Sequence, residues 1–209
     1  MSGSDAALLK LFAVIASGDD ANALRSLAET PSLSTTALST GATRQQPNGY
    51  FFEAIRHGVY TGDTALHVAA AAYRRAVVEK LCDLGADVNA RNRRGAEPLH
   101  YAVDGGPGSV SWNPTEQAQV IQRLLKEGAN PNAVDKGGVT PLHRAVRNRC
   151  AEAVRVLLDG GADAHRQNKS GSTPIALATT TTGRGGTGTT AAKEQQALIV
   201  ALLENHDDA

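Results

Sequence analysis

The feature that most constrains this chain of 209 residues is a short pattern that occurs four times. A glycine, any residue, a threonine or glutamate, a proline or alanine, and a leucine or isoleucine follow one another at 62–66, 95–99, 138–142 and 171–175. The first and last intervals between the copies are equal, and the middle interval is longer. Because a pattern that recurs at nearly regular intervals is typical of repeat proteins, we predict an array of like units rather than a closed globule.

The best-defined copy covers 138–164 and predicts two helices. Thr140 and Pro141 form a helix start, since a hydroxyl can cap free N–H groups and a proline at the first helical position needs none. A second helix follows the turn at Asn148 and ends at 160–161, where glycine takes a positive φ at little cost. This helix–turn–helix unit is too small to bury its own apolar faces, so neighbouring copies must cover them.

The repeated unit resembles the ankyrin repeat. Residues 140–145 read TPLHRA, which matches the TPLHxA signature of that family without interruption, and 63–70 and 97–102 are near matches. The exits from the second helices, with their Gly-Ala pairs, match the family as well. The resemblance covers most of the chain after Tyr60 and covers the segment before it poorly.

The resemblance implies an all-α ankyrin-repeat solenoid of about five helix–turn–helix units with short projecting hairpins. We expect a single domain over 1–209 with long inserted loops in units three and five, at 105–112 and 179–190. It divides into N-terminal cap helices at 5–29, an irregular connection at 30–60, and repeat units at 61–94, 95–137, 138–170 and 171–205.

The segment before the first full repeat is predicted with less detail. Two helices are expected around 17–19, with acidic side chains such as Asp5 pointing outward, as the end of a solenoid requires. In the connection, the preferred interpretation is that Phe51 and Phe52 fold back over the gap between the cap and the first full repeat. The alternative is an exposed apolar anchor for a partner.

The charge balance and the cysteines limit the class of protein. The 21 basic and 21 acidic residues cancel, so the overall field predicts neither nucleic-acid nor membrane binding. Cys82 and Cys150 lie far apart in the sequence, which is typical of a reducing compartment. Neither a signal peptide nor an apolar run of about 18 residues is recognisable. We therefore expect the cytoplasm, with export into a host cell as the alternative.

The histidines raise the question of a metal or catalytic site. His67, His100 and His143 occupy one repeat position, and the resemblance implies that they tie adjacent loops together through hydrogen bonds. Copies in stacked repeats stand about 10 Å apart, too far to share a zinc ion with bonds of roughly 2 Å. A serine nucleophile elbow, an HExxH motif and a spaced Cys–His pair are all missing from the sequence. We predict no enzyme, no catalytic residue, no metal and no cofactor.

The distribution of charge suggests a binding surface. The resemblance implies that the hairpin tips and the exposed face of the first helices form a concave surface, and basic residues gather there. The arginines are expected to steer an acidic partner, with Tyr101, at a surface-variable position, as an anchor. The predicted partner-binding residues are Arg91, Arg93, Arg94, Tyr101, Trp112, Lys136, Arg144, Arg147, Arg166 and Lys169.

These observations predict a monomeric, non-enzymatic protein–protein interaction module that binds an acidic or extended protein segment on its concave face. One alternative is that the hairpin tips are simply solvated. Another is nucleic-acid binding through the basic hairpin side, which the zero net charge and the scarcity of aromatic platforms disfavour. For Trp112, a contact with a partner and a role in pinning its own glycine-rich loop both stay open.

Overall fold

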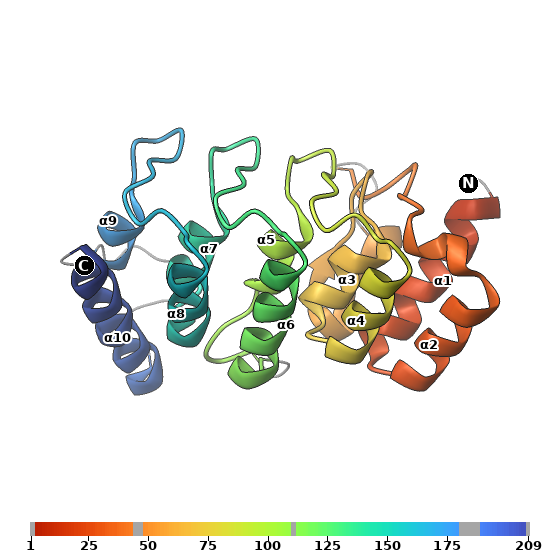
Figure 1. Ribbon diagram of the computed structural model, residues 1–209, viewed down its shortest axis with the longest axis horizontal. Coiled ribbons are helices and arrows are strands. Elements are labelled where there is room, and N and C mark those ends of the chain that lie inside the picture. The colour runs from red at the N-terminus through yellow and green to blue at the C-terminus, as the bar shows by residue number, and fades with distance from the viewer. Residues whose placement is uncertain (1–2, 44–47, 110–111, 180–188, 208–209) are drawn as a thin grey trace.

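The computed structural model describes residues 3–43, 48–109, 112–179 and 189–207, and its helices come in consecutive pairs (Figure 1). The helices are α1 (Gly3–Ser17), α2 (Asp20–Glu29), α3 (Ala65–Ala71), α4 (Arg75–Asp83), α5 (Pro98–Ala102), α6 (Pro114–Lys126), α7 (Pro141–Arg147), α8 (Ala151–Asp159), α9 (Pro174–Thr179) and α10 (Thr190–Asp207). Between α2 and α3 lie the antiparallel strands β1 (Phe51–Phe52) and β2 (His57–Gly58) and three short 3-10 turns, at Pro31–Ser34, Asn48–Tyr50 and Glu53–Ile55.

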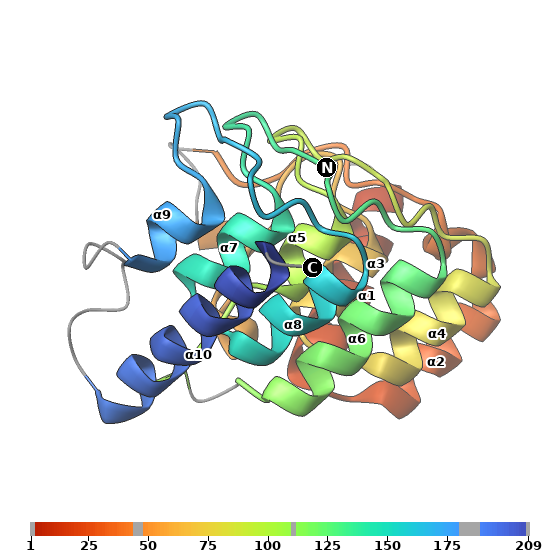
Figure 2. The same ribbon diagram turned by 60° about the vertical axis from the view of Figure 1, so that its left-hand side comes forward.

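The helices form two layers that run the length of the molecule. The first helices of the pairs contact one another in the order α1, α3, α5, α7 and α9, and the second helices in the order α2, α4, α6, α8 and α10. Figures 1 and 2 show this row from two sides, with the hairpins that join successive pairs projecting from one edge. The expected all-α solenoid is confirmed.

One continuous apolar core holds the layers together, from Leu8 in α1 to Leu203 in α10. Helices as short as α5 are not stable alone in water, because helix nucleation is unfavourable and few hydrogen bonds follow it. Each helix is therefore stabilised by the apolar faces of its neighbours. The cores of adjacent units merge, with Leu66, Leu99 and Leu142 all completely buried at equivalent positions.

The three repeated histidines join each unit to the next. The side chains of His67, His100 and His143 are completely buried, and their Nε2 atoms lie 3.2, 3.0 and 3.0 Å from a backbone oxygen just ahead of the next unit's first helix. The Nδ1 atom of His67 lies 3.0 Å from the hydroxyl of Thr64, as the resemblance implied. Glu97 replaces that threonine in the third unit, and its buried Oε2 atom has no hydrogen-bond partner among the described residues.

The segment after α2 folds back onto the cap helices. The carboxylate of Asp5 accepts hydrogen bonds from the backbone N–H and hydroxyl of Ser39 and from the hydroxyl of Thr40. Asp5 is therefore buried, which corrects the expectation that it points outward. Of the two phenylalanines in the connection, one folds back onto the cap helices and the other is exposed. Phe52 packs edge-on against Phe12, with ring centroids 6.4 Å apart, whereas Phe51 is 43% exposed.

The inserted loop of the third unit is fixed by contacts with α6 and with the backbone at Asn148. The indole N–H of Trp112 donates to Oε1 of Gln117, at 3.0 Å, and so pins the loop to α6. Gly106 packs against the backbone oxygen of Asn148 so closely that an added Cβ would overlap it. The second expected insertion, at 179–190, lies mostly outside the described residues.

Two further expectations concern membranes and metals. Within the described ranges, every helix is too short or too polar to cross a lipid bilayer. The same residues contain no group of three or more His, Cys, Asp or Glu side chains placed to hold a metal ion. Cys82 and Cys150 are both free thiols.

Candidate functional site

Three hairpins with the same backbone turn carry most of the predicted basic residues. In each turn, a side-chain oxygen of Asn92, Asp135 or Asn168 accepts hydrogen bonds of 2.8–3.1 Å from the backbone N–H groups two and four residues later. A glycine three residues after this position takes a positive φ, +75° at Gly95 and +72° at Gly138. Asx residues and glycine favour such turns, and together they present the residue that follows the Asx position at the tip.

A ladder of backbone hydrogen bonds fixes the hairpins to one another. The N–H groups of Arg93, Lys136 and Lys169 each donate to a carbonyl oxygen of the preceding hairpin, at 2.7, 2.8 and 3.0 Å. Adjacent hairpins lie so close together that an added Cβ at Gly138 would be 2.9 Å from the backbone nitrogen of Lys169. The tips are therefore held in register. We call the side chains of Arg93, Lys136 and Lys169 the rim.

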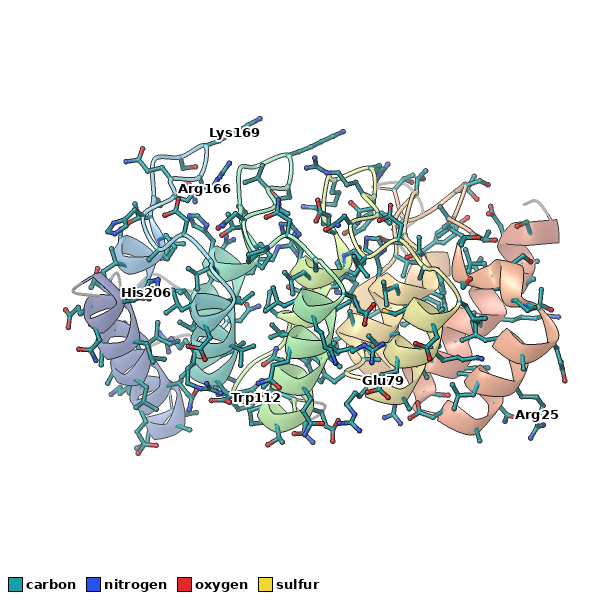
Figure 3. All side chains as sticks on the ribbon, viewed as in Figure 1. Arg25, Glu79, Trp112, Arg166, Lys169 and His206 are labelled. Carbon is teal, nitrogen blue, oxygen red and sulfur yellow. The ribbon has the colours of Figure 1, made fainter. Side chains whose placement is uncertain are left out.

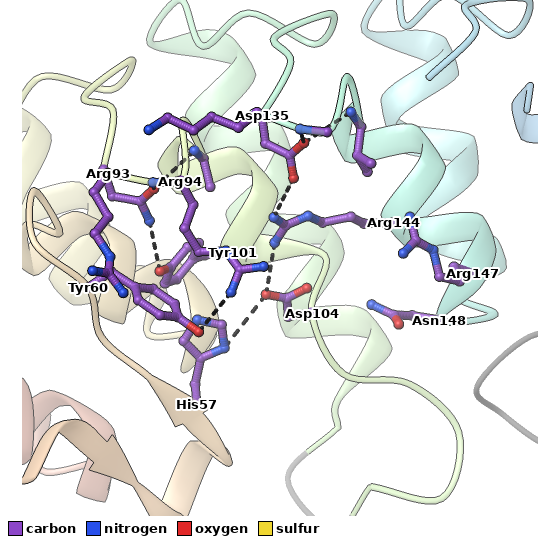
Figure 4. A pocket seen from close by; sticks show the side chains of 15 residues that line it. His57, Tyr60, Arg93, Arg94, Tyr101, Asp104, Asp135, Arg144, Arg147 and Asn148 are labelled. Atoms are coloured by element: carbon purple, nitrogen blue, oxygen red, sulfur yellow. Dashed lines mark hydrogen bonds and ion pairs between the residues drawn. The ribbon is translucent and has the colours of Figure 1, made fainter. Parts of the chain in front are cut away.

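Below the rim, β2, the hairpins and the inner helices α5 and α7 enclose a groove of about 890 Å³ (Figure 4). Its charged lining is mainly basic and consists of Arg93, Arg94, Lys136, Arg144 and Arg147, against Asp104 and Asp135. We call Tyr101, Asp104, Asp135 and Arg144 the floor of the groove.

The arginine of the floor is already neutralised. Arg144 lies between two carboxylates, with Nη1 3.3 Å from Oδ2 of Asp104 and Nη2 3.1 Å from Oδ2 of Asp135 (Figure 4). Burial alone would lower the pKa of Arg144, but the two carboxylates raise it. Burial likewise disfavours the charge of Asp135, yet hydrogen bonds from Arg144 and from two backbone N–H groups hold the pKa of that carboxyl below its usual value. Arg144, predicted to bind a partner, therefore already has two carboxylate partners within the fold.

Tyr101 is buried beneath the surface of the groove. Only 2% of it is exposed, and its hydroxyl donates to Oδ2 of Asp63 at 2.8 Å and accepts from Nδ2 of Asn92 at 3.0 Å. Burial and the nearby Asp63 carboxylate raise the pKa of Tyr101 well above its ordinary value. The prediction that Tyr101 lies on the surface is therefore wrong. Sequence spacing could not show that Asp63, from the preceding unit, accepts a hydrogen bond from the Tyr101 hydroxyl.

Two arginines at one end of the groove share the ring of Tyr60. The guanidinium carbons of Arg93 and Arg94 lie 5.6 and 5.1 Å from the ring centroid, within the range of a cation–π contact. Arg93 also donates to the backbone oxygen of Ala42 at 2.6 Å, and Arg94 donates to the Tyr60 hydroxyl at 3.1 Å. Within the described part of the chain, neither arginine forms an ion pair with a carboxylate.

Four of the other predicted residues lie outside the groove lining. Arg91 lies 3.7 Å from the carboxylate of Glu97 and is partly neutralised. Lys169 and Arg166 project from the last hairpin, exposed to solvent (Figure 3). Trp112 lies at the opposite edge of the molecule, beside α6, so the structure does not bring it together with the groove.

Arg147 lines the groove from α7, and its Nε atom is buried without a hydrogen-bond partner among the described residues. Among the groove residues that were not predicted as partner-binding are two with aromatic rings, His57 and Tyr60. His57 lies 3.6 Å from the Asp104 carboxylate, and its ring centroid is 4.2 Å from that of Tyr101 with the two rings tilted by 59°. The ring of Tyr60 contacts both Arg93 and Arg94. His57 and Tyr60 both lie in the connection before the first full repeat, where no motif or periodicity distinguished them.

Comparison with known families agrees with this architecture. A profile described as ankyrin repeats in three copies matches 11–112, a single ankyrin repeat profile matches 94–136, and a profile described as ankyrin repeats in many copies matches 124–178. Together the matches run from α1 to α9. Ankyrin repeats are general protein–protein interaction modules and are typically non-enzymatic. Because these profile matches together cover most of the chain, the chain belongs to the ankyrin repeat family.

Proposed function

We propose that this protein is a non-enzymatic module that binds an acidic, extended protein segment along the groove and its rim. The observation that carries the proposal is a contrast in charge compensation. Arg144 in the floor contacts two carboxylates, whereas Arg93, Lys136 and Lys169 of the rim have no carboxylate partner in the described residues. Exposed cations without an internal carboxylate can pair with the carboxylates of another protein, and their field speeds the encounter.

The rigidity of the hairpins supports the same proposal. Each tip is fixed twice, by the turn at its Asx residue and by the backbone ladder to the preceding hairpin. Association costs free energy whenever a loop must be ordered, so a surface that is ordered before binding retains more of its contact energy.

Nucleic acid is the less favoured ligand for the same cations. Binding of single strands relies on aromatic rings on which bases stack. In the described groove, the ring of Tyr60 is already occupied by Arg93 and Arg94, and Tyr101 is buried. Nucleic-acid binding is therefore treated as an outcome of the test.

Fluorescence anisotropy with defined probes tests the proposal. The probes are a peptide rich in Glu and Ser, the matching peptide with Gln in place of Glu, and random single-stranded and duplex DNA, each over a series of salt concentrations. We expect binding of the Glu peptide that weakens as salt rises, little binding of the Gln peptide, and weaker binding of DNA than of the Glu peptide.

A matched pair of variants makes this test specific. The triple variant Arg93→Ala, Lys136→Ala, Lys169→Ala removes the rim and should abolish the salt-sensitive binding. The control Arg25→Ala, Arg75→Ala, Lys193→Ala removes the same charge from exposed positions on α2, α4 and α10 and should bind as the wild type does. Equal losses in the two variants, or tighter binding of DNA than of the Glu peptide, would contradict the proposal.

A further inference from the structure

The three cations of the rim occupy the same position in three consecutive hairpins. Arg93, Lys136 and Lys169 each follow the Asx residue of their turn, and their separations in the sequence are those of the repeats themselves. The backbone ladder holds these positions in register, and Figure 1 shows the hairpins side by side along one edge. Because packed helices lie about 8–10 Å apart, the rim presents one cation roughly every 10 Å along the stack.

The fold itself does not compensate this row of charge. All three side chains are exposed, and none forms an ion pair within the part of the chain that the structure describes. Like charges about one Debye length apart, roughly 10 Å at 0.1 M salt, repel one another weakly. This repulsion does not favour the folded state, and a ligand with negative charges at the same spacing would relieve it.

We propose that the rim selects an acidic segment in the polyproline II conformation with a carboxylate at every third residue. This inference rests on the proposed function and adds the conformation and charge spacing of the partner. A polyproline II chain advances about 3.1 Å per residue with three residues per turn. Three residues therefore cover about 9 Å and bring side chains back to one face, so each carboxylate lies opposite one rim cation. In a β-strand, side chains three residues apart point to opposite faces.

An acidic helix fits the rim less well. A helix rises about 1.5 Å per residue, so carboxylates about seven residues apart would match the spacing. Partner helices, however, dock mainly through an apolar face. The large exposed apolar side chains of the described residues are Phe51 and Leu198, and neither lies on a hairpin tip.

The test compares peptides of equal length, composition and charge that differ only in the spacing of their glutamates. Each carries three Glu residues among Pro, Ser and Gln, placed at every second, every third or every fourth position, and a helix-forming peptide carries Glu at every seventh. Binding is measured by fluorescence anisotropy at low salt. We expect the spacing of three to bind roughly fivefold tighter than the spacings of two and four, because a surface ion pair contributes modestly and lysines adapt in part.

Removal of the middle cation provides the decisive control. Lys136→Gln should abolish the preference for a spacing of three, whereas Arg25→Gln on α2 should leave it unchanged. Equal affinities for all spacings, or the tightest binding by the helical peptide, would overturn this inference and leave the proposed function intact. Failure of every acidic peptide to bind above the Gln control would overturn both.

Discussion

The floor and the rim of the groove contain the same residue type in opposite states. In the floor, Arg144 bridges Asp104 and Asp135, and its side chain is only 18% exposed. At the rim, the exposed Arg93 contacts a backbone oxygen and an aromatic ring but no carboxylate of the described residues. One arginine is therefore neutralised within the stack, whereas the other has no carboxylate partner among the described residues. Counting basic residues along the sequence does not separate these two roles.

The largest expected difference is in stability. Arg144→Ala leaves two partly buried carboxylates without their cation, and the free energy of unfolding should fall by about 2–3 kcal/mol. Lys136→Ala at the rim should change it by less than about 0.5 kcal/mol, because an exposed side chain without partners is lost. Urea unfolding followed by circular dichroism measures both. A loss for Arg144→Ala as small as that for Lys136→Ala would remove the distinction between floor and rim.

A second expectation concerns pH, through a buried histidine beneath the floor. Burial, reinforced by the charge of Arg144, lowers the pKa of His100 to about 3. The unfolded chain has a histidine pKa of about 6.5, so between these values the unfolded state binds a proton that the folded state does not. The contribution is fully present above pH 6.5 and decreases by about 1.4 kcal/mol per pH unit as the pH falls below it. Burial also lowers the pKa of His67 and of His143, which act in the same direction.

Urea unfolding at several pH values between neutrality and mild acid measures this slope. The variant His100→Gln should be less stable than the wild type near neutral pH but should lose less stability on acidification. Identical slopes in the two proteins would show that His100 does not supply the expected proton linkage. The rim triple variant should keep the wild-type slope, since its substitutions leave the three buried histidines unchanged.

A smaller effect is expected where the third unit departs from its neighbours. Glu97 stands in the place of the threonine, its Oε2 atom is buried without a partner in the described chain, and burial raises its pKa despite the nearby Arg91. Glu97→Thr should raise the free energy of unfolding by about 1 kcal/mol near neutral pH, because it removes a buried carboxylate oxygen that has no hydrogen-bond partner among the described residues. Thermal unfolding measures the gain. A destabilised Glu97→Thr variant would mean that the ion pair with Arg91 outweighs the cost of burial.

The sequence predicted the parts of this molecule that repeat. The spacing of the repeated pattern located the helix pairs, the resemblance gave the histidines their structural role, and it placed most of the basic residues on the hairpins. These features depend on contacts within a unit or between identical positions of neighbouring units, so periodicity is enough to find them.

Contacts between unlike positions could not be predicted in this way. Arg144 meets Asp104 from 40 residues away, and Tyr101 is buried because Asp63 accepts its hydroxyl across 38 residues. His57 and Tyr60 reach the groove from a connection that has no periodicity at all. Whether a charge is free or paired therefore depends on partners that single-sequence patterns do not identify.

Chemical-shift mapping tests the central claim most directly, that the partner meets the rim. The amide resonances of the isotopically labelled protein are followed while the Glu-rich peptide is added. We expect the largest changes at Arg93, Lys136 and Lys169 and their immediate neighbours, with the outer helices α2, α4, α6 and α8 unchanged. Changes concentrated on those outer helices or around Trp112, with the rim unaffected, would contradict the account.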